Sequence, residues 1–470
     1  MTTVLAIDQG TSATKAIVVD GDGVVRGSSE RSVHPAYLAH GGVEQDPHEL
    51  LASVLSAGRA AVAEAGLDID IVALANQGET VLAWDPETGQ PLSAMIVWQD
   101  RRADDICREL EPRRALVEKR TGLVLDPYFS APKQAWLRRN VTRDGVVTTS
   151  DSWLVHHLTG AVVTDAATAS RSLLTSLDTG HWDSELIALF GLHDERLPEI
   201  VPSDTVVGHT DAFGRTAAVG GLILDQQAAL LGQACLRAGE AKCTFGTGAF
   251  LLANTGTAAT RSTAGLTASV AWRARGQTVY CLDGQVYTAA SAVRWMERLG
   301  YIDEAADLDQ VAAADNGGVL AVPAFAGLGA PWWKPDATAA VHGMTLSTTP
   351  GHLVLAVLEG IAAQVAELGS SVAVDLGAPL TRLRVDGGLT QSRTLMQAVA
   401  NLMQIDIEVY PGAHATPLGA ACLARIALDP SLSLADAVVD RGAPTIYPPR
   451  WSADRAHDFR TRWVALARSL

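Results

Sequence analysis

Residues 4–19, VLAIDQGTSATKAIVV, decide the fold of this chain. Two apolar runs, Val4–Ile7 and Ala16–Val19, have the length of short strands, and the residues between them are mostly small and polar. A strong hairpin turn at Asp20–Gly23 leads into a third apolar segment that begins at Val24. The chain is therefore expected to open with a three-stranded meander.

The same arrangement recurs about half a chain later. Lys242–Phe245 leads into Gly246–Gly248, and Phe250–Ala253 follows as the return strand. A duplicated unit of this kind predicts an α/β fold with two similar halves that face each other across a cleft. We expect the two domains to be residues 1–238 and residues 239–470.

Helical and buried-strand patterns fill out both halves. Helical spacing is present at Leu50–Val62, Ala228–Leu236, Ala289–Leu299, His352–Leu368 and Ser392–Met403, and apolar runs occur at Ile71–Ala75 and Leu383–Val385. These elements fit the expected α/β class.

The composition is that of a globular protein with an acidic surface. The 470 residues are 48% hydrophobic and 19% charged, and 36 Lys and Arg against 52 Asp and Glu give a net charge of −16. Such a charge repels nucleic acid and anionic lipid, so neither is an expected partner. Phosphate groups must then be bound by local backbone donors and a metal ion.

Cysteine usage and hydropathy predict a cytoplasmic protein. Five cysteines without CxxC spacing indicate reduced thiols and argue against a zinc site. The longest uncharged stretch of note, Gly317–Trp333, contains Gly and Pro residues that favour a buried strand and loop. The N-terminus lacks the charge pattern of a signal peptide. We expect no membrane segment.

The polar turn between the first two strands has the donors that a phosphate-bearing ligand needs. It offers the hydroxyls of Thr11 and Ser12 and free backbone N–H groups, and Asp8 can hold Mg²⁺ through water. An ordinary hairpin turn explains the segment equally well. Gly246–Gly248 is a weak signal alone, but two turns facing one cleft can hold a polyphosphate from both sides. Neither GxxxxGK[ST] nor GxGxxG occurs in the chain.

Polar residues follow three apolar runs, where open α/β sheets place their binding sites. Asp225 follows Leu222–Leu224 and precedes a helical pattern, so it is either a helix N-cap or a general base near the domain crossing. Asn76–Thr80 and Trp98–Asp100 follow two other runs and predict the wall of a small polar pocket.

With these motifs the sequence resembles the FGGY carbohydrate kinases, and within them the glycerol kinase branch. The matches, in order, are Ala6–Thr11, Asn76-Gln77, Glu79-Thr80, Ile96–Gln99, Thr121–Val124, Asp126–Ser130, Asp225–Ala229, Phe245–Gly248, Val322–Phe325, Gly327–Pro331 and Val385–Gly388. So many ordered matches over nearly the whole chain make chance negligible.

The resemblance implies two actin/hexokinase-like (ribonuclease H-like) domains around an interdomain cleft, which close on ATP, Mg²⁺ and a polyol as a homodimer or homotetramer. It implies Asp225 as the catalytic base, and Asp8 and Asp225 as the carboxylates near the metal ion. The residues implied for ATP are two phosphate loops, Thr11, Ser12 and Lys15 and then Gly246, Thr247 and Gly248, with Ala290, Arg294, Gly387 and Gly388 around the adenosine. The residues implied around the polyol are Gly78, Glu79, Trp98, Tyr128, Asp225, Gln226 and Phe250.

Three positions depart from the glycerol kinase pattern. Gly78 stands where that branch has Arg before Glu79, so we expect space for a longer C4–C5 polyol, or glycerol bound poorly. Ala290 and Arg294 stand where the branch has Gly and Gln near the adenine, so the adenosine contacts are less well defined.

The sequence supports transfer of phosphate from ATP to a terminal hydroxyl of a small polyol. A ketose kinase of the same family, such as a xylulokinase, is an alternative. An actin- or chaperone-type ATPase without a small substrate is another, although only 82 residues follow Gly388 (470 − 388) and they read as helices of the second half. A catalytically inactive sugar sensor is disfavoured because Asp8, Asp225 and both turns are present.

Overall fold

The computed structural model of the chain describes residues 2–412, 414–439 and 442–470. Its N-terminal half is built on a six-stranded sheet in the order β14-β15-β6-β1-β2-β3. These strands are β14 (Gly208–Thr210), β15 (Ala217–Leu224), β6 (Ile71–Asn76), β1 (Val4–Gln9), β2 (Ala13–Val19) and β3 (Val25–Ser32). The expected opening meander is therefore confirmed as β1, β2 and β3.

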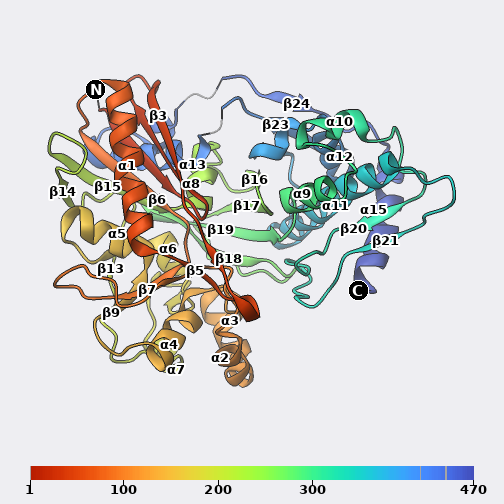
Figure 1. The fold of residues 1–470 in the computed structure, drawn as a ribbon. Coiled ribbons are helices and arrows are strands. Elements are labelled where there is room, and N and C mark those ends of the chain that lie inside the picture. The colour runs from red at the N-terminus through yellow and green to blue at the C-terminus, as the bar shows by residue number, and fades with distance from the viewer. Residues whose placement is uncertain (1, 413, 440–441) are drawn as a thin grey trace.

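The C-terminal half is built on a seven-stranded sheet in the order β18-β19-β17-β16-β22-β23-β24. Its strands are β18 (Thr267–Ala274), β19 (Gln277–Val286), β17 (Ala249–Gly256), β16 (Ala241–Phe245), β22 (Arg382–Asp386), β23 (Asp406–Val409) and β24 (Thr445–Tyr447). Figure 1 shows the two halves side by side, with the N-terminal half on the left.

The two sheets share one pattern of pairing, which confirms the predicted duplication. In the first, β1 pairs with β2 antiparallel and with β6 parallel, and β6 pairs with β15 parallel. In the second, β16 pairs with β17 antiparallel and with β22 parallel, and β22 pairs with β23 parallel. The turns β1–β2 and β16–β17 therefore occupy equivalent places in the two halves.

Helices surround both sheets. The N-terminal half contributes α1 (Pro47–Ala65), α2 (Asp104–Glu109), α3 (Arg114–Thr121), α4 (Ser130–Asn140), α5 (Ser150–Thr159), α6 (Ala166–Ser170), α7 (Ser184–Leu189) and α8 (Asp225–Gly232). The C-terminal half contributes α9 (Ala290–Arg298), α10 (Leu308–Val311), α11 (Pro350–Leu376), α12 (Arg393–Met403), α13 (Ala415–Leu428), α14 (Leu434–Ala437) and α15 (Ala453–Arg468).

Smaller sheets complete the architecture. A five-stranded sheet contains β4 (Ala36–Tyr37), β5 (Val43–Gln45), β8 (Met95–Ile96), β7 (Val81–Trp84) and β9 (Val146–Thr149), in that order. Three two-stranded sheets pair β10 (Val163–Asp165) with β13 (Glu199–Val201), β11 (Thr175–Ser176) with β12 (His181–Trp182), and β20 (Leu320–Val322) with β21 (Ala340–His342).

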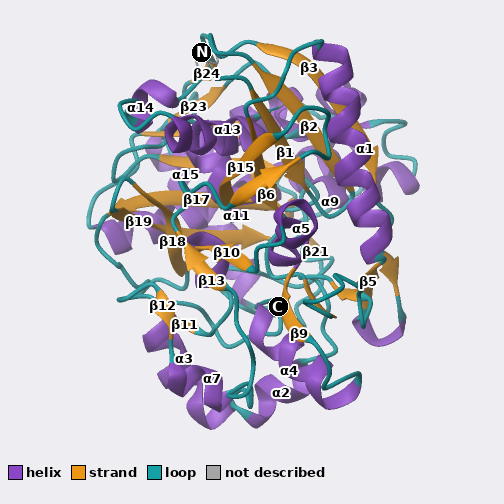
Figure 2. Ribbon diagram, turned by 90° about the vertical axis from the view of Figure 1, so that its left-hand side faces the viewer, coloured by secondary structure: helices purple, strands orange, loops and turns teal. Residues whose placement is uncertain are grey.

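The central strands of the first sheet, β1, β2, β6 and β15, are covered on both faces, which explains why they are mainly apolar, while the edge strands β3 and β14 are more exposed. Helix α1 packs against β2 and β3, and α13 packs against β1, β6 and β15 (Figure 2). Helices α8 and α13 cross so closely that a Cβ at Gly232 would lie 1.9 Å from the carbonyl oxygen of Ala415. A late segment of the chain thus covers the N-terminal sheet, and the two halves share a hydrophobic core.

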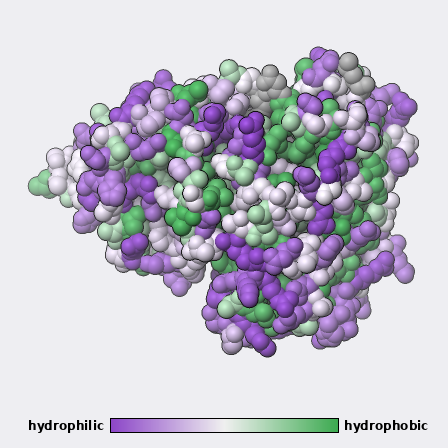
Figure 3. Space-filling view, turned by 180° about the vertical axis from the view of Figure 1, so that it is seen from behind, coloured by the Kyte–Doolittle hydropathy of each residue, from purple (hydrophilic) through white to green (hydrophobic). Residues whose placement is uncertain are grey.

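One helix among the described residues, α11, is long and apolar enough to cross a membrane, but 83% of its most apolar window is buried inside the fold. The core of the C-terminal half accounts for its hydropathy. On the face seen in Figure 3, hydrophilic and hydrophobic residues are interspersed.

The expected domain boundary after residue 238 lies between α8 and β16 and stays a prediction.

Candidate active site

A pocket of about 500 Å³ lies between the two halves and brings together most of the residues predicted for the site. Its lining from the N-terminal half is Thr11, Ser12, Pro35, Tyr37, Gln77, Glu79, Trp98, Gln99, Tyr128, Arg171, Leu224, Asp225, Gln226 and Gln227; its lining from the C-terminal half is Thr247, Phe250, Asp283 and Arg294. The carboxyl ends of several strands meet here, as in other open α/β sheets.

The turn between β1 and β2 is tied to the pocket wall by hydrogen bonds. Trp98 Nε1 donates to Thr11 Oγ1 at 2.8 Å, and Gln45 Nε2 donates to the Thr11 carbonyl at 2.6 Å. Gln77 Nε2 in turn donates to Gln45 Oε1 at 2.8 Å. The hydroxyl group of Thr11 is therefore held beside the ring of Trp98.

The turn between β16 and β17 is held by the start of α9. Ala290 N–H donates to the Gly246 carbonyl at 3.0 Å, and Ala289 N–H donates to the Thr247 carbonyl at 2.9 Å. A Cβ at Gly248 would lie 2.4 Å from the carbonyl oxygen of Val286, so glycine is required there. Thr247 is the residue of this turn that lines the pocket.

Asp225 is the first residue of α8 and follows directly on β15, so the sheet and the helix together fix its position. One of its carboxylate oxygens accepts the Gln226 N–H at 2.6 Å. Burial raises the pKa of Asp225 to about 7, and the negative charge of Asp8 adds to this rise. A carboxylate with such a pKa can both accept and release a proton near neutral pH.

Three aromatic rings form one wall of the pocket. The ring centroids of Trp98 and Tyr128 are 5.4 Å apart, and those of Trp98 and Phe250 are 6.3 Å apart, both edge-on. The buried carboxylate of Glu79 also lines the pocket, and burial raises its pKa to about 7 against the opposing effect of Arg171. Apolar faces beside acceptor oxygens suit a small ligand with carbon and hydroxyl surfaces.

The space at position 78 itself is occupied in this structure, while the expectation of a longer polyol beside Glu79 stays a prediction. Gly78 has φ +61°, and a Cβ there would lie 2.2 Å from Cδ1 of Leu224. The side chain of Leu224 therefore occupies the place that a Cβ at position 78 would take. Gly78 itself is not part of the pocket lining.

Several other predicted residues lie outside the lining of the pocket. Lys15 is half exposed and is 4.0 Å from Glu30, while Gly246, Gly248 and Ala290 form the scaffold of the second turn. Gly387 abuts β16, since a Cβ there would lie 2.3 Å from the carbonyl oxygen of Phe245; Gly388 has open space around it. Their roles in nucleotide binding stay predictions.

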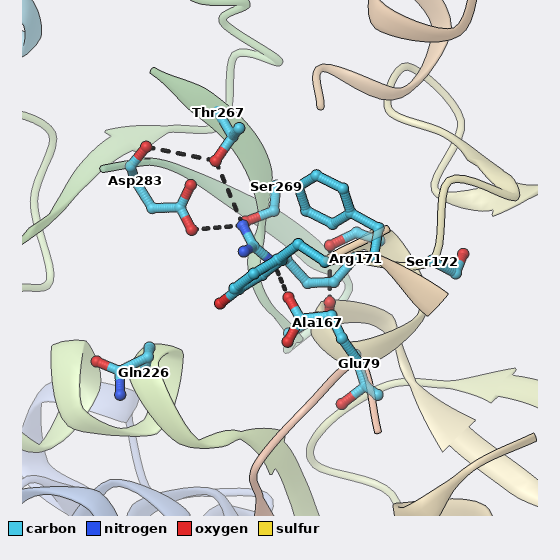
Figure 4. Close-up of polar contacts among 12 residues, drawn as sticks. Glu79, Ala167, Arg171, Ser172, Gln226, Thr267, Ser269 and Asp283 are labelled. Carbon is cyan, nitrogen blue, oxygen red and sulfur yellow. Dashed lines mark hydrogen bonds and ion pairs between the residues drawn. The ribbon is translucent and has the colours of Figure 1, made fainter. Parts of the chain in front are cut away.

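Three charged residues of the site were missed by the sequence analysis. Arg171, just after α6, is buried and forms ion pairs with Glu79 and with Asp283 of β19 (Figure 4). Lys242 is also buried, and its Nζ donates to Gln226 Oε1 at 2.6 Å and to Thr244 Oγ1 at 2.9 Å. Charged residues within apolar segments were the available signal, because such residues are rarely buried without a partner.

The carboxylates of Asp8 and Asp225 fit a magnesium ion that is bound mainly through phosphate and water. Among the described residues, no group of three or more His, Cys, Asp or Glu forms a metal cage. Asp8 nevertheless lies close enough to Asp225 to raise its pKa, and burial raises the pKa of Asp8 to about 6. Mg²⁺ is commonly held by one or two carboxylates together with substrate phosphates.

Comparison with known proteins places the chain among the carbohydrate kinases. The N-terminal domain of the FGGY family of carbohydrate kinases matches residues 3–232, and its C-terminal domain matches residues 241–428. The chain belongs to the FGGY family. This FGGY kinase has a mixed α/β fold of two sheet-containing halves and is a glycerol kinase-like phosphotransferase.

Relatives cover almost the whole of this FGGY kinase. It is 44% identical to the glycerol kinase of Trichlorobacter lovleyi over 91% of this chain and 90% of that protein. It is 42% identical to the glycerol kinase of Thermus brockianus over 92% and 91%. The structure of Plasmodium falciparum glycerol kinase with ADP superposes with a TM-score of 0.92 at 33% identity, covering 100% of this chain and 98% of that one.

Proposed function

We propose that this kinase transfers the γ-phosphoryl group of ATP to a terminal hydroxyl of a small polyol, with glycerol as the preferred substrate. The observation that carries the proposal is one pocket in which Asp225 lies with Glu79, an aromatic wall and residues of both turns. Its glycerol kinase relatives support this reading. A C4–C5 polyol and a ketose, as for a xylulokinase, are the alternatives.

Asp225 would act as the general base. Phosphoryl transfer passes through a loose transition state, so alignment and charge stabilisation supply most of the rate. Asp225 accepts the proton of the attacking hydroxyl late in transfer, and its position at the start of α8 keeps the carboxylate fixed. Its raised pKa matches a proton acceptor that works near neutral pH.

The polyol would lie between the aromatic wall and the carboxylates. The carboxylate of Glu79 accepts a hydrogen bond from one hydroxyl, and Gln226 and Tyr128 position the others. Trp98 and Phe250 cover the carbon chain and exclude water, which limits hydrolysis of ATP. Glu79 and Asp225 would thus each accept a hydrogen bond from a hydroxyl group of the substrate.

ATP would lie with its phosphates between the two turns. Thr11 and Ser12 face the phosphates from one side and Thr247 from the other, while Gly387 and Gly388 lie beside the adenosine. Asp8 and Asp225 would hold Mg²⁺, which neutralises charge on the phosphate oxygens. We further infer a cytoplasmic homodimer or homotetramer.

A substrate panel tests this proposal. We expect glycerol to give a higher kcat/KM than C4 and C5 polyols and D-xylulose, because Leu224 fills the space that a longer polyol would use beside Gly78. The measurement is ADP release at saturating MgATP, with a no-polyol control. A higher kcat/KM for a longer polyol or a ketose would contradict the assignment, and equal ATP turnover without any polyol would favour an ATPase.

Arg294 is expected to contribute to nucleotide binding. It is exposed on the rim of the pocket on the same side as Thr247, and no ion pair joins it to another described residue. A free guanidinium there can make a charge-assisted bond to a phosphate, worth about 1.5–3 kcal/mol. Arg294→Gln is therefore expected to raise the KM for ATP about tenfold without changing the KM for glycerol.

The matched control is Arg298→Gln, on the same helix but absent from the pocket lining. We expect this variant to keep the KM for ATP of the parent enzyme. An unchanged KM for ATP in Arg294→Gln would show that the guanidinium does not reach the nucleotide.

A further inference from the structure

Arg171 connects the two halves of the molecule at the floor of the pocket. Its Nε donates to Glu79 Oε1 at 2.6 Å, and its Nη1 donates to the carboxylate of Asp283. Glu79 belongs to the N-terminal half and Asp283 to β19 of the C-terminal half. Figure 4 shows the guanidinium of Arg171 between these two carboxylates.

The surroundings of Arg171 fix its guanidinium group. The side chain is buried, and its guanidinium carbon lies 5.6 Å from the centre of the Tyr128 ring and 5.1 Å from that of Phe129. Nη1 also approaches Thr267 Oγ1 of β18 at 3.4 Å. Two strands of the C-terminal half, β18 and β19, therefore hold Nη1 of Arg171. This fixes the position from which Nε donates to Glu79.

Glu79 lies in a strained stretch of backbone, and Arg171 is the ion-pair partner of its carboxylate among the described residues. Glu79 has φ +46° and follows Gly78 at φ +61°, a left-handed conformation that is unfavourable for a side chain with a Cβ. Lys133 is another buried cation whose charge acts on Glu79, but its Nζ donates hydrogen bonds to the carbonyls of Pro127, Tyr128 and Phe129. The direct bond to Glu79 therefore comes from Arg171.

We propose that Arg171 is a positioning residue for polyol binding: it fixes the Glu79 carboxylate toward the pocket by bridging it to Asp283 of the other half. This inference rests on the proposed function, in which Glu79 binds a substrate hydroxyl. It gives the site a guanidinium even though Gly78 has no side chain. The bridge also makes polyol affinity depend on how the two halves are aligned. The ATP phosphates would contact both halves, through the β1–β2 turn and the β16–β17 turn.

The first test separates substrate binding from turnover. Arg171→Met is expected to raise the KM for glycerol at least about tenfold, with kcat within about threefold and the KM for ATP unchanged. Arg171→Lys keeps the charge but can reach only one carboxylate well, so its KM should lie between those of the parent and Arg171→Met. A fall in kcat with an unchanged KM for glycerol would overturn the proposal.

Arg138→Met is the matched control, because Arg138 forms a largely buried ion pair with Glu195, and neither residue lines the pocket. It should lower the melting temperature without changing the KM for glycerol. If Arg171→Met does not fold, Asp283→Leu replaces it; this variant removes the acceptor at a similar side-chain size and is expected to raise the KM for glycerol severalfold. An unchanged KM in Asp283→Leu would overturn the bridge.

A double-mutant cycle with Glu79→Ala, which removes the acceptor of the Arg171 bond, decides whether Arg171 acts through Glu79. We expect the double variant Glu79→Ala/Arg171→Met to have nearly the same KM for glycerol as Glu79→Ala alone. Additive effects would overturn the proposal, because Arg171 would then contact the substrate or act on the fold independently. If the parent enzyme phosphorylated no polyol, the proposed function would fail, and this inference with it.

Discussion

Asp225→Asn is expected to lower kcat by about 10²–10⁴-fold, the usual contribution of a general base, while ATP still binds. Asparagine keeps the size of the side chain but cannot accept the hydroxyl proton. The surrounding structure should persist, because the Asp225 side chain accepts a backbone hydrogen bond from its neighbour Gln226 and does not cap α8. Turnover is measured by ADP release and nucleotide affinity by calorimetry.

Asp183→Asn provides the control for loss of an aspartate near a helix start. Asp183 caps α7 and pairs with Arg120, and it does not line the pocket. Its removal should lower stability and leave kcat unchanged. Near-normal turnover in Asp225→Asn would exclude Asp225 as the base, and loss of ATP binding in that variant would assign it a structural role instead.

The sequence predicted the fold because its strongest signals are local. The runs around residues 4–19 and 242–253 contain both strands and their turn, so each half could be inferred from one contiguous segment. The placement of α13 on the N-terminal sheet could not be inferred in the same way. An apolar helix fits any apolar surface, and only the close crossing at Gly232 shows which surface it covers.

The site was predicted where one segment carries the signal and missed where distant segments meet. Asp225, Thr11 and Thr247 lie within two residues of the end of a strand, so pattern and position identify them. The bridge of Arg171 joins residues from three separate parts of the chain, and nothing near any of them in sequence marks its partner. Gly78 shows the same limit, because a missing side chain does not indicate which neighbour, here Leu224, occupies its place.

Gly78→Ala is expected to lower the free energy of unfolding by about 2–4 kcal/mol, which combines the strain of a positive φ with overpacking against Leu224. It should also lower kcat/KM for glycerol about 10²-fold, because Glu79 is the next residue and a shift of about 1 Å in a binding group has effects of that size. Urea unfolding and ADP release measure the two effects.

Gly66→Ala measures the backbone strain alone, so the difference between it and Gly78→Ala gives the steric part of the effect. Gly66, after α1, has φ +62°, almost the same as Gly78, but a Cβ there meets no atom within 4 Å. We expect it to cost about 1 kcal/mol of stability and no activity. If Gly78→Ala were equally mild, the contact with Leu224 would not determine the cost of a side chain at position 78.

The same contact predicts that Gly78→Arg weakens glycerol binding. It also predicts that adding Leu224→Ala to Gly78→Ala restores part of the activity.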